Sequence, residues 1–170
     1  MVRQELAIEL ADGEEKIRLM QENAYILLTK LNWQVYMLSL EEEAFPEEER
    51  ISMLRQMFEA NRTLMPSDPE YAYNWQASHV PWQLAQHYSE LGQVDEAIRW
   101  LEIMRRACDR DFDAPYSLKS PVFHGLEHKR NGRWDEHWML SLMDDPYFDN
   151  VRADSRFAQI KADLEAAVTE

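Results

Sequence analysis

Apolar residues recur at three- and four-residue spacing over residues 78–109, in two runs that meet at Gly92. Spacing of this kind is typical of an amphipathic helix with one buried face. Glycine readily adopts the left-handed backbone conformation that ends a helix, and so short a connection folds the second helix back on the first. The pattern therefore predicts a helical hairpin. The residues of its two apolar faces are Leu84, Ala85, Tyr88 and Leu91 in the first helix and Ala97, Leu101, Met104 and Cys108 in the second.

The same periodicity predicts further helices before and after this hairpin. The expected helices span residues 2–11, 14–43, 46–65, 67–91, 93–110, 134–143 and 154–168. Asp145 and Asp154 stand where side chains cap a short turn and the last helix. Residues 111–133 hold two prolines and two glycines and are expected to form a long loop. No stretch alternates apolar and polar residues between turn signals, so we predict an all-α protein.

The expected helix over residues 14–43 is apolar on two faces. A helix with two apolar faces is usually sandwiched between neighbours, so burial on both sides is expected. One face consists of Ile17, Met20, Ala24, Leu27, Leu31 and Leu38, and the other of Leu19, Ile26, Trp33, Tyr36, Met37 and Leu40.

The hairpin at residues 78–109 resembles a tetratricopeptide repeat, which is a helix pair of about 34 residues. The positions that match the repeat pattern are Leu84-Ala85, Tyr88, Gly92, Ala97 and Leu101. The chain departs from the pattern at Pro81, where tryptophan is preferred, and at Asp109, where proline closes the repeat. The resemblance implies a tetratricopeptide-like antiparallel helical array, an α-α superhelix. Residues 1–170 would then form a single helical-repeat domain, with its best repeat at 78–109, the long loop at 111–133 and closing helices at 134–168.

The C-terminal stretch DDPYFDNVRADSRFAQIKADLE resembles the sequence that closes many tetratricopeptide arrays. The segment PEEERISMLRQMFEAN, the hairpin, the 111–133 loop and this stretch follow one another in a particular order. That order is similar to the C-terminal helical domains of bacterial Xre-type helix-turn-helix regulators. The resemblance implies a non-catalytic interaction or sensor domain, the ligand-binding or dimerisation part of a transcriptional regulator without its DNA-binding half. The alternative is a free-standing tetratricopeptide-like scaffold that binds a protein partner.

The chain carries a net charge of −14, from 32 acidic and 18 basic residues. Such a surface repels nucleic-acid phosphates and anionic membranes, so direct binding to either is not expected. Acidic residues near the start stand where a signal peptide needs an apolar run, and no run approaches the roughly 20 apolar residues of a membrane span. These features favour the cytoplasm. The expected partner is a protein, a peptide or a small apolar ligand, and the resemblance also allows a homodimer.

Few residues are candidates for chemistry. His124 and His128 have the four-residue spacing of helical metal ligands, but a bare pair of histidines is not a ligand set, and exposed loop histidines are the simpler interpretation. Cys108, the single cysteine, lies on an apolar stripe, where a thiol behaves as a small hydrophobe rather than a nucleophile. We therefore expect no enzyme activity, no metal and no cofactor. A His- or Cys-dependent enzyme is the least favoured alternative.

The remaining candidate is a binding surface on the first helix of the best repeat. Tetratricopeptide arrays usually bind partners on the inner face of this helix, and by resemblance that face carries His79, Trp82, Gln86 and Ser89. An aromatic, weakly polar groove fits an apolar peptide or a small molecule. The competing interpretation is that Trp82 packs against a neighbouring helix.

Overall fold

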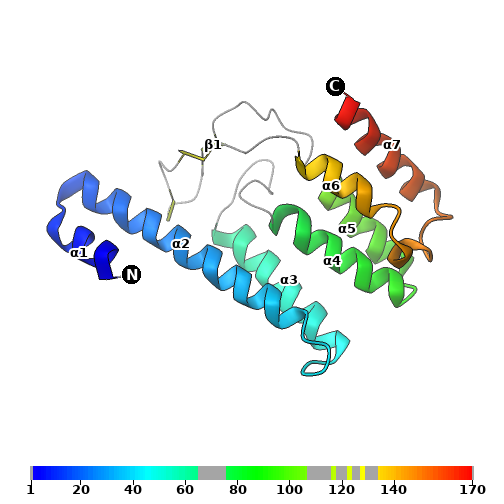
Figure 1. Ribbon diagram of the computed structural model, residues 1–170, viewed down its shortest axis with the longest axis horizontal. Helices are drawn as coiled ribbons and strands as arrows, with labels where there is room; N and C mark the ends of the chain where they lie inside the picture. The colour runs from blue at the N-terminus through cyan, green and yellow to red at the C-terminus, as the bar shows by residue number, and fades with distance from the viewer. Residues whose placement is uncertain are drawn as a thin grey trace.

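The computed structural model describes residues 2–64, 76–106, 116–117, 122–123, 127–128 and 134–169. Figure 1 shows these segments as a row of helices, with the two termini far apart. The helices are α1 (Val2–Leu10), α2 (Gly13–Ser39), α3 (Glu47–Leu64), α4 (Gln76–Glu90), α5 (Val94–Arg106), α6 (Trp134–Leu142) and α7 (Ser155–Thr169). A short 3₁₀ helix, η1 (Pro146–Phe148), joins the last two. The prediction of an all-helical architecture is confirmed.

The helix bounds lie close to those expected wherever the structure describes them, except that the long helix ends at Ser39 and not at residue 43. The expected start at residue 67 of the helix that ends at 91, the expected end at residue 110 of the next helix, and Cys108 lie outside the described residues. Within the expected 111–133 loop, a two-residue strand β1 (Tyr116–Ser117) pairs antiparallel with β2 (Glu127–His128). This pairing was not predicted from the sequence, because two residues are too few to show the alternation of apolar and polar residues that indicates a strand.

The turn at Gly92 closes the α4–α5 hairpin as the sequence predicts. Gly92 has a φ of 69°, in the left-handed region. The amide of Gln93 donates to the carbonyl of Tyr88 at 2.8 Å, and the amide of Gly92 donates to the carbonyl of Ser89 at 2.9 Å. These two bonds form the Schellman pattern, which satisfies carbonyls that the end of a helix leaves without partners.

The hydrophobic core lies around this hairpin. Ala85 and Ala97 are fully buried, and their small side chains let the α4 and α5 backbones approach closely. On the α3 side, the ring of Phe58 meets that of Trp100 edge-on, with 5.1 Å between the centroids. On the other side, α7 packs against α5 and α6. The largest fully buried apolar side chains of this core are Leu54, Leu84, Ile98, Leu101, Met104, Met139, Met143, Phe148 and Leu164.

Two aspartates begin the C-terminal elements, as expected. The carboxylate of Asp145 accepts a hydrogen bond from the amide of Tyr147 at 3.2 Å, and that of Asp154 accepts one from the amide of Arg156 at 2.8 Å. The side chain and amide of Arg156 together lower the pKa of Asp154 to about 2. The capping carboxylate therefore stays ionised across the physiological range.

The expectation that the long helix is buried on both sides is wrong for the single chain. Within the described residues, α3 and the turn at Phe123 cover one side of α2, where Leu28, Asn32 and Ser39 are buried. The two expected apolar faces flank this contact and are mostly exposed, although Leu19, Ala24 and Tyr36 are half-buried. α1 folds back beside the start of α2 (Figure 1), where Ile17 and Met20 are still 59% and 53% exposed. No helix in the described ranges combines the length and apolar character needed to cross a membrane.

Close approach of α4 and α5 generates the first prediction. Ala97→Trp should lower the free energy of unfolding by about 1–3 kcal/mol, because the ring has no room between the two backbones. Thermal and urea unfolding measure the change. Ala162→Trp, on the exposed side of α7, is the matched control and should unfold almost like the parent chain. Equal stability of the two variants would contradict the packing at position 97.

Candidate functional site

The predicted binding face lies along α4. Trp82, Gln86 and Ser89 occupy successive turns of one side of this helix, whereas the side chain of His79 lies outside the described residues. Trp82 is half-buried, and its ring meets that of Trp138 in α6 edge-on at 5.5 Å. Trp82 therefore packs against a neighbouring helix, as the competing interpretation holds.

The C-terminal end of this face is closed. Ser89 is fully buried, and its carbonyl accepts a hydrogen bond from the side-chain amide of Asn150 at 2.9 Å. The η1 segment packs here against α4. Ser89 is therefore not accessible to a ligand. Of the predicted binding residues that the structure describes, Gln86 and the exposed part of the Trp82 side chain are accessible. Ligand binding on this face stays a prediction.

A cluster of titratable side chains, which was not predicted from the sequence, lies where the start of α3 meets the end of α4. The imidazole Nδ1 of buried His87 lies 3.3 Å from a carboxylate oxygen of Glu47. Glu90 stands one turn beyond His87 on α4. Arg50, whose side chain is 12% exposed, lies 3.3 Å from Glu42. His87 and Glu90 are three residues apart, but Glu47 comes from a different helix, so sequence spacing could not bring the three together.

Glu47, His87 and Glu90 are the described residues that could hold a metal ion, because their ligand atoms all lie within 4.8 Å of one another. One imidazole and two carboxylates suit a divalent transition metal. The guanidinium of Arg50 already supplies positive charge beside them, which opposes a second cation. The cluster is better described as a polar junction between α3 and α4. Of the metal pair proposed from sequence, His124 and the side chain of His128 lie outside the described residues.

Burial is the main cause of a raised pKa at Glu90. His87 and Arg50 attract the ionised carboxylate and lower this pKa, while Glu47 and Glu42 repel it and raise it, and the balance is upward from 4.5. Ionised Glu90 is therefore less favourable in the folded chain than in the unfolded chain.

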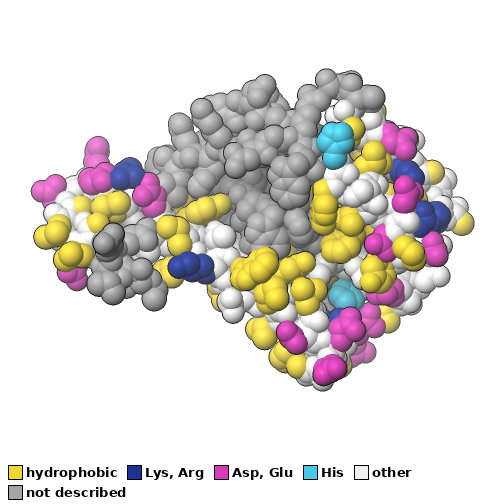
Figure 2. All heavy atoms as spheres, in the orientation of Figure 1, with side chains coloured by type: hydrophobic (Ala, Val, Ile, Leu, Met, Phe, Trp, Pro, Cys, Tyr) yellow, Lys and Arg dark blue, Asp and Glu magenta, His cyan; other side chains and the backbone are white. Residues whose placement is uncertain are grey.

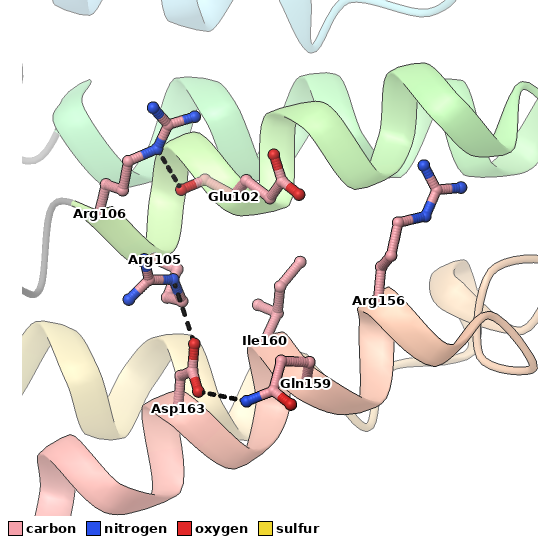
Figure 3. A pocket seen from close by; sticks show the side chains of 7 residues that line it. All are labelled: Glu102, Arg105, Arg106, Arg156, Gln159, Ile160 and Asp163. Carbon is pink, nitrogen blue, oxygen red and sulfur yellow. Dashed lines mark hydrogen bonds and ion pairs between the residues drawn. The ribbon is translucent and has the colours of Figure 1, made fainter.

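A shallow pocket of about 300 Å³ lies between α5 and α7 (Figure 3). Its cationic side chains face carboxylates or carbonyls of the same chain. Arg105 lies 3.5 Å from Asp163, Arg106 donates to the carbonyl of Glu102, and Arg156 donates to Asp95 outside the pocket. An anionic ligand would have to displace these contacts.

The most extensive unusual surface is apolar. Among the described residues, eleven of the fifteen large apolar side chains that are exposed lie between Leu6 and Leu40. Figure 2 shows apolar side chains gathered over α2. We call this surface the α1–α2 band. It consists of Leu6, Leu10, Ile17, Met20, Ile26, Leu27, Leu31, Trp33, Met37, Leu38 and Leu40.

Comparison with protein-family models, with curated proteins and with solved structures returns no match to this chain. Function is therefore inferred from the surfaces of the chain itself. Of these, the α1–α2 band differs most from the surface of an ordinary monomer, where large apolar side chains are scattered singly.

The raised pKa of Glu90 generates a pH-dependent prediction. When folding raises the pKa of a carboxyl group, the free energy of unfolding is greater at low pH, where the group is protonated. This contribution is lost as the pH rises through the folded-state pKa. Glu90→Gln should therefore raise the melting temperature at pH 7, and the gain should disappear well below pH 4.5. Glu43→Gln, in the exposed turn after α2, removes the same charge and is the control. A lower melting temperature for Glu90→Gln at pH 7 would show that attraction to His87 and Arg50 outweighs burial.

Proposed function

We propose that this chain is a non-catalytic helical-repeat interaction module, the sensor or dimerisation part of a bacterial transcriptional regulator. The α1–α2 band is its contact surface. The observation that carries the proposal is the exposure of eleven large apolar side chains on consecutive helices, including Leu10 at 79% and Leu31 at 59%. Soluble monomers usually expose large apolar side chains singly, and grouped exposed apolar side chains commonly mark interaction sites.

The size of the band supports a stable contact. If about half of each side chain is buried on binding, and full burial removes roughly 60–120 Å² per side chain, the band contributes on the order of 500 Å² of apolar area. Stable interfaces bury about 800 Å² per partner, of which somewhat over half is apolar. The band as a whole therefore holds approximately the apolar area of one ordinary interface, divided between the two apolar faces of α2.

The regulator assignment draws its support from the tail and segment order of the sequence, and the band fits it. A net charge of −14 keeps such a module away from DNA, so its influence on DNA would pass through a joined domain. Association through the band could then set the spacing of two such domains. The free-standing scaffold is the alternative, and the gene sequence upstream separates the two. An in-frame DNA-binding domain supports the regulator.

Site-specific crosslinking tests the contact surface. A photoreactive benzoylphenylalanine in place of Leu31 should, on irradiation in cells of the source organism, join the chain to a protein partner. The same group in place of Leu91, which is exposed at the α4–α5 turn outside the band, is the control and should give little product. Crosslinking at position 31 no stronger than at position 91 would contradict the band as the contact surface.

A further inference from the structure

A regular stripe runs along the α1–α2 band. Its members on α2 alternate strictly in steps of three and four, and we call them the α2 seam. They are Ile17, Met20, Ala24, Leu27, Leu31, Gln34 and Leu38. This is the repeat of positions a and d in a coiled coil, in which the average period of 3.5 residues keeps the stripe facing one partner helix.

The chain's own core does not use this seam. The residues that α2 buries are Leu28, Asn32 and Ser39, on the side that faces α3. Ile17 and Leu31 of the seam are each 59% exposed. The seam is therefore a second, independent contact face, and its spacing indicates that a helix covers it.

Length also fits a helix pair. From Ile17 to Leu38 the seam covers three heptads, or roughly 32 Å at about 1.5 Å per residue. The same spacing continues back through Leu10 and Leu6. Gly13, with a φ of 52°, turns α1 aside between them.

Charge favours a second copy of this chain as the occupant. α2 carries three basic side chains, Lys16, Arg18 and Lys30, and three acidic ones, Glu14, Glu15 and Glu22, so it is neutral within a chain whose net charge is −14. Two such acidic chains repel each other over most of their surface, and this repulsion is least where α2 meets α2. A two-fold axis also places each apolar layer of the seam against an apolar layer of the same length.

We propose that the α2 seam pairs with the α2 seam of a second copy in a two-helix coiled coil. The proposal rests on the proposed function, since it names the partner of the same band. Gln34 is the polar member of the seam. A polar residue at such a position lowers the stability of a coiled coil while fixing its register.

Sedimentation equilibrium of the full 170-residue chain across the micromolar range tests the pairing. The parent chain should have twice the mass of the 20.3 kDa monomer at the upper end of this range. Leu27→Glu with Leu31→Glu should have the monomer mass and an unchanged helical circular dichroism spectrum, because two acids per chain would face each other in the seam. Leu64→Glu with Leu91→Glu alters exposed leucines outside the band and should remain dimeric.

Two results would overturn the pairing: a monomeric parent chain, or a dimer that survives both seam substitutions. If the double variant loses helix, Gln34→Leu decides, since it should lower the dimer dissociation constant at least tenfold and an unchanged constant would contradict the seam. A monomeric chain that still crosslinks at position 31 to a different protein would overturn the pairing and leave the proposed function intact. A dimer with no crosslink at position 31 in cells would overturn the proposed function.

Discussion

The fold depends on the close approach of α4 and α5. Gly92 reverses the chain within one residue, and the buried alanines Ala85 and Ala97 remove the bulk that would separate the two backbones. With the hairpin closed, α5 presents an apolar face on which α7 packs, while Trp100 meets Phe58 of α3. Helices that are marginal in isolation are thus held by their packing on this pair.

The sequence predicted the features that depend on local spacing. Gly92, the buried alanines and the caps at Asp145 and Asp154 each act within a few residues, so three- and four-residue patterns were sufficient to find them. The junction of His87 with Glu47 was missed because it joins side chains 40 residues apart. The predicted face on α4 came from the resemblance to a tetratricopeptide repeat, which carried no information on Asn150, whose side chain binds the carbonyl of Ser89.

The two apolar faces of the long helix show where a correct pattern led to an incorrect inference. Periodicity reports that a face is apolar, but it does not report whether the same chain covers it. α2 is fixed to α3 in part by a reciprocal amide pair between Asn32 and Asn61, at 2.7 and 2.8 Å. Asn32 is buried and Asn61 is half-buried, so this pair favours one alignment of the two helices, since a shift would leave the Asn32 amide without its partner. This alignment directs the α2 seam away from the core.

The core around the α4–α5 pair is complete within one chain, whereas we propose that the exposed side of α2 is completed by association. Amide hydrogen exchange followed by mass spectrometry, at protein concentrations above and below the association range, tests this most directly. We expect amides between Ile17 and Leu38 to exchange faster on dilution, while amides between Leu84 and Met104 keep their protection at every concentration. Exchange in α2 that is slow and independent of concentration would contradict the account.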